Sequence, residues 1–217
     1  MFFENIGTMQ TQLKSICREG KVTEVFPERH SCRVTFEDRD NLVSAELPIL
    51  TLTAGENKIY WLPDIDERVV VLSASNDFTG GGGYVLGSLY TGDEKPLENN
   101  QNVYALKMSD NFEVKYEREQ HNFQMTFNDG TKIFYENGES DHEMNIKFSD
   151  GCEISYSYGS GADFLMKFAD GSTIEHDGQR GDLDMKIKGE INITAAGEIN
   201  IESSQDVNVK GANIHLN

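Results

Sequence analysis

Three Asp-Gly pairs are the residues of this chain whose type and spacing most readily suggest chemistry. They stand 21 and 20 residues apart, at Asp129–Gly130, Asp150–Gly151 and Asp170–Gly171, with a weaker copy at Asp110–Asn111. Recurring acids could hold calcium, and Asp163, Asp182 and Asp184 faintly resemble parts of nonapeptide calcium repeats. Those repeats need GGxGxDxUx in tandem, which is missing. Asp-Gly between alternating strands is instead a hairpin signal, because both central residues of a type I′ turn have positive φ. We therefore predict turns rather than a metal site.

The other candidate catalytic and metal-binding residues lack the spacing that their chemistry needs. The five histidines show no HExxH-like pattern, and Cys17, Cys32 and Cys152 form no CxxC pair, which disfavours a zinc ribbon or a disulfide framework. Paired carboxylates for glycoside hydrolysis stay open in so acidic a chain, but none stands out in an aromatic cleft. We expect no cofactor and no enzymatic activity.

Two features of the N-terminal half could indicate nucleotide or nucleic-acid binding. The glycine run 80–83 is followed by no GK[ST], so we interpret it as a hairpin loop. Tyr60 and Trp61 could stack on bases. Their acidic neighbours Asp64 and Asp66 disfavour that reading and favour packing in the core or at an interface.

The charge of the chain excludes several classes of partner. The net charge is −18, of which residues 1–92 contribute −5 and residues 93–217 contribute −13. Such a surface repels nucleic acid and anionic lipid headgroups. The first ten residues lack the regions of a signal peptide, and no apolar run is long enough for a membrane helix. We expect assembly in a reducing cytoplasm.

Alternating patterns predict a small β barrel over residues 20–96. Strands are expected at 21–25 and 31–36, around 43–47, within 59–75 and at 84–90, separated by a break near Pro27 and by glycine-rich loops. Five short strands of this kind fit a Greek-key barrel of the OB type. Apolar residues at helical spacing over 6–18 predict a short N-terminal helix or tether within residues 1–19.

The region 104–182 is predicted to be a run of strands that reverse about every ten residues. Each Asp-Gly pair marks one reversal, and the turn-like sequences EREQHN, ENGESD, YGSGAD and HDGQRG mark the opposite ones. The polar segment 97–103 is expected to be a linker.

The last stretch, 183–217, is an eight-residue repeat with apolar residues at the first and third places. Both apolar side chains of an octad point to one face of a strand. One chain alone would have open edges and a bare apolar face. Three chains around a common axis would pair the edges and bury the face. The expected trimer core is Leu183, Met185, Ile187, Ile191, Ile193, Ile199, Ile201, Val207 and Val209. A single-chain parallel β-helix is the alternative for the octads alone.

The order GKVTEV, CRVTFE, IYWLPDIDERVVVLSA and YVLGSLYTGDEKP resembles the phage baseplate assembly protein V family. Its members are central spikes of contractile tails and are related to the valine-glycine repeat spike proteins of type VI secretion. The resemblance is carried by the closing Gly87, Tyr90, Gly92 and Pro96 and covers residues 15–97. It implies an all-β protein with an N-terminal OB-fold barrel followed by a trimeric, intertwined triple-stranded β-helix.

The resemblance also implies partners at both ends. Hub and baseplate proteins are expected at the OB end, and the target cell envelope is met in passing. Some members end in a His-x-His iron apex, which this chain lacks, so a cap of the PAAR type is expected at the blunt end. The tip residues are Ile214, His215, Leu216 and Asn217. His215 in three copies is a minor candidate for a metal on the threefold axis.

The sequence therefore predicts a structural, trimeric spike of a contractile phage tail or related injection particle. It would nucleate the baseplate hub, pierce the target envelope on sheath contraction and reside in the virion or particle baseplate. Two other classes stay open: an OB-fold nucleic-acid-binding protein, and a tail protein that binds or degrades envelope polysaccharide.

Overall fold

The computed structural model describes residues 16–73, 82–92, 94–139, 141–159 and 161–215. Its ordered elements are all strands apart from two short 3-10 helices. The chain divides into two units, 1–97 and 98–217, and each is described by itself. The all-β prediction is confirmed.

The first unit is a six-stranded barrel. Its strands are β1 (Cys17–Phe26), β2 (Ser31–Phe36), β3 (Leu42–Val43), β4 (Leu47–Pro48), β5 (Arg68–Ser73) and β6 (Gly83–Ser88). They follow the order β3-β2-β1-β5-β6, with β4 paired to β2. A parallel bridge from Ile49 to Val85 closes the barrel. The core is filled by Val22, Cys32, Val34, Phe36, Leu47, Val69, Val71 and Val85.

The local sequence explains where the barrel strands break. Pro27 begins a 3-10 turn that His30 ends in the left-handed conformation, at the predicted break. The strand expected over 43–47 is instead split between β3 and β4. Strand β1 already begins at Cys17, where the N-terminal helix was expected to continue to residue 18. The rest of that predicted helix lies outside the described residues. Burial raises the pKa of Cys32 to about 11, which leaves its thiol protonated.

Gly20 permits the close approach of β1 to β2. A Cβ at this position would meet Cγ1 of Val34 and would lie 2.9 Å from the carbonyl oxygen of Thr35. We expect Gly20→Ala to destabilise the barrel by about 1–3 kcal/mol through overpacking. Urea unfolding of the full chain, followed by Trp61 fluorescence, measures this. Gly55→Ala is the matched control, because a Cβ at Gly55 meets nothing within 4 Å. Equal stability of the two variants would contradict the prediction.

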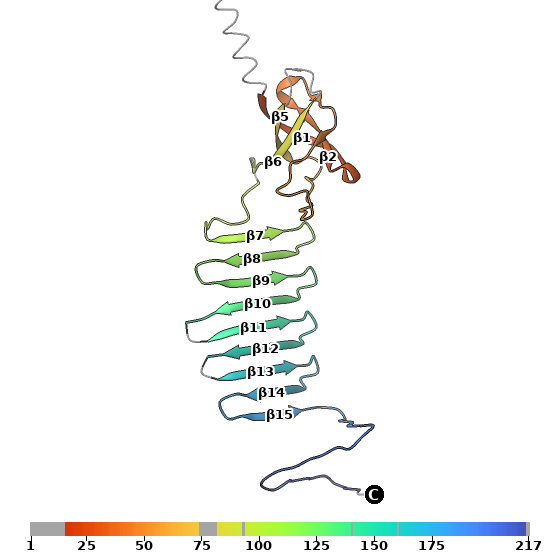
Figure 1. Cartoon of the computed structure of the whole chain (residues 1–217), viewed down its shortest axis with the longest axis vertical. Helices are drawn as coiled ribbons and strands as arrows, with labels where there is room; N and C mark the ends of the chain where they lie inside the picture. The colour runs from red at the N-terminus through yellow and green to blue at the C-terminus, as the bar shows by residue number, and fades with distance from the viewer. Residues whose placement is uncertain (1–15, 74–81, 93, 140, 160, 216–217) are drawn as a thin grey trace, which may run out of the picture. The chain divides into compact units, whose positions relative to one another are not determined.

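The second unit is an antiparallel meander in which each strand pairs with the next (Figure 1). Nine strands follow in sequence order: β7 (Val103–Lys107), β8 (Glu113–Glu117), β9 (Asn122–Thr126), β10 (Lys132–Asn137), β11 (His142–Lys147), β12 (Glu153–Tyr158), β13 (Ala162–Lys167), β14 (Thr173–Asp177) and β15 (Asp182–Lys186). Reversal of the chain about every ten residues is thus confirmed. The last strand, β15, begins at residue 182, where the hairpin region was expected to end, and continues to residue 186.

The Asp-Gly pairs form turns, but not of type I′. Gly130, Gly151 and Gly171 have φ values of 89°, 91° and 84°, whereas no described aspartate of these pairs has positive φ. The Gly130 amide donates to the Phe127 carbonyl, and the Phe127 amide to the Thr131 carbonyl. This is a type I turn followed by a left-handed glycine, the common three-residue hairpin loop. Each aspartate also accepts the amide two residues on, as Asp129 does from Thr131 at 2.8 Å.

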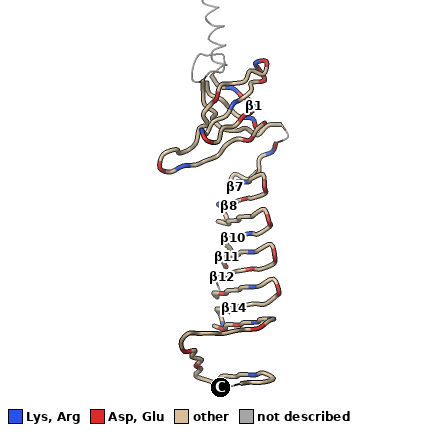
Figure 2. The backbone as a smooth tube through the Cα atoms, turned by 90° about the vertical axis from the view of Figure 1, so that its right-hand side faces the viewer, with Lys and Arg blue, Asp and Glu red and all other residues tan. Residues whose placement is uncertain are grey.

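Hydrogen bonds also join successive turns on the side of the sheet where the Asp-Gly turns connect the strands. Acidic residues recur along the meander (Figure 2). The Ser149 amide donates to Oγ1 of Thr131 at 3.3 Å, and the Lys188 amide donates to Oγ of Ser172 at 3.0 Å. The residue in the equivalent position between them is Cys152, whose thiol contacts Asp150 instead. The ladder of turn hydroxyls is therefore interrupted at its centre.

Cys152→Ser is expected to complete this ladder by offering a hydroxyl to the amide of Ala169. The gain is that of one ordinary hydrogen bond, about 0.5–1.5 kcal/mol, and raises the thermal unfolding midpoint. Cys152→Ala is the control, because it removes the thiol without adding a hydroxyl. The prediction fails if alanine stabilises the chain as much as serine.

The turn aspartates also make the meander sensitive to acid. The backbone amide and hydroxyl of Thr131 lower the pKa of Asp129, and those of Ser172 lower the pKa of Asp170. A lowered folded-state pKa gives stability that is complete above the ordinary aspartate value near 3.9 and is lost as pH falls through the folded value. We expect the melting temperature to fall on acidification below about pH 4. The double variant Asp129→Asn, Asp170→Asn keeps an accepting oxygen at each turn but cannot be protonated in this range. Its melting temperature should therefore fall less steeply with pH, and an unchanged slope would contradict the prediction.

Candidate assembly interface

One face of the meander carries two continuous rows of apolar side chains. The strand register places directly opposite one another Leu106, Val114, Met125, Ile133, Ile146, Ile154, Met166, Ile174 and Met185. A second row lies two residues away from the first along each strand, and therefore on the same face. It consists of Tyr104, Tyr116, Phe123, Tyr135, Met144, Tyr156, Phe164, His176 and Leu183. We call this surface the apolar face.

A third row lies at the turn edge of the apolar face. Met108, Phe127, Phe148 and Phe168 each follow the aliphatic row by two residues and begin an Asp-Gly or Asp-Asn turn. The rings of Phe112 and Phe127 meet edge to face at 5.6 Å between centroids. The Asp-Gly repeat therefore places an apolar anchor at the end of every second strand.

The apolar face is only partly covered within the single chain, and its side chains are half-buried or exposed. Tyr104 is 61% and Met144 53% exposed, and Leu183 and Met185, which end the two rows, are 65% and 53% exposed. Contiguous apolar patches of this extent mark interaction sites rather than ordinary protein surface. The two predicted core residues in β15 thus continue a surface that spans all nine strands.

The opposite face of the sheet is polar, and several of its side chains contact one another. Asn145 at its centre is buried and donates to the carboxylates of Glu143 and Glu153 at 2.9 and 2.7 Å. The bond from Asn145 and the nearby Lys147 lower the pKa of Glu153. Lys147 also lies 5.1 Å from the centroid of the Phe134 ring. Among the described residues, Oδ1 of Asn145 accepts no hydrogen bond, so this buried amide is only half satisfied within the single chain. The apolar face is the larger surface left to a partner.

A tyrosine–histidine cluster borders the apolar face at the edge away from the Asp-Gly turns. The His142 ring stacks against Tyr158 at 4.6 Å and lies parallel to Tyr135 at 6.4 Å. Nδ1 of His142 is 3.4 Å from the hydroxyl of Tyr135. A hydrogen bond with Tyr158 raises the pKa of Tyr135. The cluster supplies polar tips at the rim of an otherwise apolar surface.

The octad segment forms no strand within its own chain. Over residues 187–215, which the structure describes throughout, there is no ladder and no backbone–backbone hydrogen bond. Ile187 is half-buried, whereas Ile193 and Ile201, at the third places, are 73% and 74% exposed. The other octad residues of the predicted core, namely Ile191, Ile199, Val207 and Val209, are also exposed. In this segment the backbone lacks strand partners and the apolar side chains are not buried. Another chain could supply both.

The tip is described only in part. Ile214 and His215 are exposed, while Leu216 and Asn217 lie outside the described residues. In the described parts of the chain, no cluster of three or more His, Cys, Asp or Glu side chains could hold a metal ion. A site on a threefold axis would take its ligands from three chains, so the role of His215 stays a prediction.

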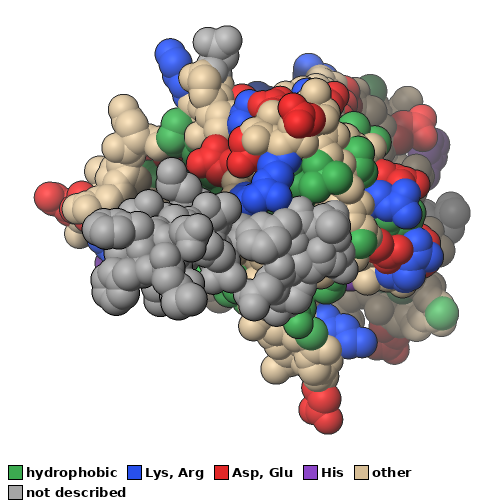
Figure 3. Space-filling view, turned by 90° about the horizontal axis from the view of Figure 1, so that it is seen from above, with side chains coloured by type: hydrophobic (Ala, Val, Ile, Leu, Met, Phe, Trp, Pro, Cys, Tyr) green, Lys and Arg blue, Asp and Glu red, His purple; other side chains and the backbone are tan. Residues whose placement is uncertain are grey.

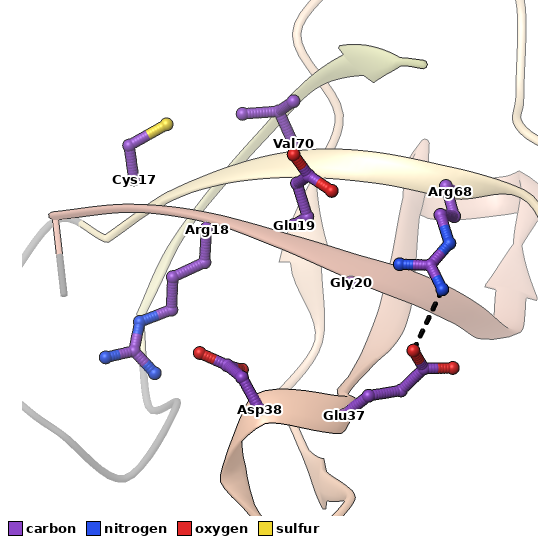
Figure 4. Close-up of a pocket in the computed structure, with 8 residues that line it drawn as sticks. All are labelled: Cys17, Arg18, Glu19, Gly20, Glu37, Asp38, Arg68 and Val70. Atoms are coloured by element: carbon purple, nitrogen blue, oxygen red, sulfur yellow. Dashed lines mark hydrogen bonds and ion pairs between the residues drawn. The ribbon is translucent and has the colours of Figure 1, made fainter. Parts of the chain in front are cut away.

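The barrel carries a charged pocket of about 450 Å³ (Figure 4). Arg68 donates to Glu37 at 2.9 Å across it, and Arg18 and Asp38 extend toward it from β1 and from the adjoining 3-10 helix. Both signs of charge line the pocket in similar number, so it offers no concentrated field for a charged substrate. No helix among the described residues has the length and apolar character needed to span a bilayer.

The first unit matches a family of known proteins. It is a small β barrel, and the second unit is a repetitive antiparallel β meander. Residues 18–90 match the family described as the type VI secretion system/phage-baseplate injector OB domain. The barrel is thus similar to that injector OB domain, which confirms the resemblance to the phage baseplate assembly protein V family.

A similarity to a curated protein extends beyond the barrel. The chain is 24% identical over 115 residues to the spike protein of Escherichia phage P2, which covers 53% of this chain and 52% of that protein. The chain thus spans about half the length of the curated relative that it matches.

Sequence reasoning missed the rows in residues 104–182 as interface residues. The signal was present, because the pattern F-x-D-G-x-x-I-x-Y places its apolar residues at alternate positions. Only the register shows that these positions line up across the sheet, since a shift of one residue would send each row to the other face. Tyr60 and Trp61, expected in a core or interface, are 63% and 48% exposed and so are not core residues.

Proposed function

We propose that the protein is the trimeric central spike of a contractile tail or related injection particle. The OB units engage the hub and baseplate, and the β domain is the needle that sheath contraction drives through the target envelope. The protein works mechanically rather than as an enzyme, as a component of the virion or particle baseplate. The observation that carries the proposal is the apolar face, which runs unbroken across nine strands and continues toward the octads.

Three chains, rather than one, meet the physical requirements of this surface. Burying an Ile, Leu or Phe side chain contributes on the order of 1.5–3 kcal/mol, and each row repeats in every chain. Octad strands with no ladder of their own gain one when neighbouring chains supply both edges. A closed three-sided shaft also resists local fraying, because each strand is held by two other chains; this gives a needle its kinetic stability.

The mass of the full-length protein in solution tests the proposal. Three copies of the 24.4 kDa chain form an elongated particle of about 73 kDa that resists denaturant. Analytical ultracentrifugation gives both mass and frictional ratio. A compact 24.4 kDa monomer would remove the main support.

At the tip, we propose that a small PAAR-type cap closes the end formed by Ile214 to Asn217. Ile214 is exposed in the single chain and stands in three copies at the end of a trimer. Binding of a PAAR protein encoded in the same genome, measured by calorimetry, tests this, and absence of binding counts against it. Metal analysis of the purified trimer tests the threefold role of His215.

A further inference from the structure

An arm of the OB unit, residues 50–61, presents apolar side chains to solvent. Its two sides are joined by a bridge between Ala54 and Lys58 and by Oγ1 of Thr51, which donates to the Ile59 carbonyl at 2.8 Å. Leu52 on this arm is 91% exposed. The surface seen from above in Figure 3 likewise carries apolar side chains between acidic and basic ones.

His30 holds the base of the arm. Its Nδ1 lies 3.2 Å from the carbonyl oxygen of Ile49, and its Nε2 lies 3.1 Å from that of Trp61. Its ring also contacts Tyr60, at 5.5 Å between centroids. The His30 ring thus lies between the carbonyl groups of Ile49 and Trp61, at the two ends of the arm, and donates to at least one of them.

A pocket of about 460 Å³ opens beside Trp61. Its apolar lining comes from Trp61, Ile65, Leu89 and Tyr90, and its polar lining includes four acidic residues and no basic one. Two of these acids already have partners: Asp66 pairs with Lys21 at 2.9 Å, and Glu67 accepts the Asp64 amide at 2.7 Å. Among the described residues, no side chain pairs with the carboxylates of Asp64 and Glu94.

We propose that this pocket receives an arginine side chain of the hub or baseplate protein on which the OB unit docks. The inference rests on the proposed function for the identity of that partner. The guanidinium stacks on an aromatic ring and pairs with carboxylates through a planar set of donors, which fits exposed Trp61 and Tyr90 beside Asp64 and Glu94. A lysine ammonium lacks both the plane and the fork of donors.

A second copy of this chain is the poorer source of the arginine. Most described arginines already contact an acidic or amide side chain of their own chain, namely Arg29, Arg33, Arg68, Arg118 and Arg180. Arg18 lies in the separate charged pocket. The net charge of −18 also makes each copy a repulsive partner for an acidic pocket.

The single tryptophan of the chain makes the pocket directly observable, because Trp61 lines it. The full-length protein is titrated with the peptide acetyl-Leu-Arg-Leu-amide and, in parallel, with the same peptide carrying citrulline, which keeps the shape without the charge. The arginine peptide should shift Trp61 emission saturably. Asp64→Asn and Glu94→Gln should each weaken this binding about tenfold, as for loss of a charged hydrogen-bond partner. Glu56→Gln, at the tip of the arm, removes the same charge outside the pocket and should leave binding unchanged.

Four outcomes overturn the inference, the last of them read together with the mass. The first is equal binding of the citrulline peptide, and the second is binding that neither pocket variant weakens. The third is Trp61 emission that changes with protein concentration and loses this change in Arg18→Gln, which would assign the pocket to a second copy. The mass of each sample is measured alongside. A 73 kDa trimer that binds no peptide contradicts this inference alone, whereas a monomer contradicts the proposed function.

Discussion

Ile133→Glu is expected to convert the proposed trimer into a 24.4 kDa monomer. Ile133 stands in the aliphatic row, opposite Met125 and Ile146. In the trimer, the substitution removes three buried side chains, each contributing on the order of 1.5–3 kcal/mol. It also brings three carboxylates into an apolar interior, where each costs several kcal/mol in lost hydration. These costs fall together at the middle of the apolar face, because β10 lies between β9 and β11 near the centre of the nine-stranded sheet. Sedimentation equilibrium over a range of protein concentrations measures the outcome.

Lys132→Glu is the matched control, because the neighbouring residue of the same strand points to the opposite, polar face. It adds an acidic side chain at the same place along the chain and should leave the mass unchanged. Circular dichroism of both variants shows whether the meander still folds. A trimeric Ile133→Glu protein would mean that the apolar face is not the assembly surface.

The barrel and the strand repeats could be predicted because their signals are local. Alternation fixes which residues of a strand share a face, and turn residues recur at a spacing of about two strands. The type of turn could not be settled, because Asp-Gly suits both a type I′ turn and a type I turn with a left-handed glycine. The two differ in the conformation of the aspartate, which in Asp129 is not left-handed.

The boundary between meander and octads escaped prediction for a related reason. Leu183 and Met185 stand two residues apart, as the apolar pair of an octad does and as two residues of a paired strand do. Only the pairing of Leu183 with His176 and of Met185 with Ile174 places them in the sheet. The sequence also did not show which apolar residues are exposed. An aromatic such as Trp61 satisfies the same pattern in a core and in a docking surface, and the three-dimensional neighbours decide.

Ile201→Asp should open the distal needle without dissolving the trimer. The nine-stranded apolar face still holds the chains together, whereas the octads have no hydrogen-bond ladder within their own chain. Three aspartates at one level of the shaft repel one another and lose their hydration, so the strands beyond Glu198 separate. We expect trypsin to cleave at Lys210 in the variant, while the parent resists.

Asn200→Asp adds the same carboxylate on the other side of the strand, so it should leave Lys210 protected. Limited proteolysis with mass spectrometry reads both variants, and the mass of the uncleaved protein shows that the trimer persists. Equal cleavage of the two would show that the octads are not packed by their apolar pairs. Cleavage of the Ile201→Asp variant alone would place the apolar residues of the octads on the axis of the shaft. It would also separate two tasks along one chain, because the meander would hold the trimer together while the octads stiffen its point.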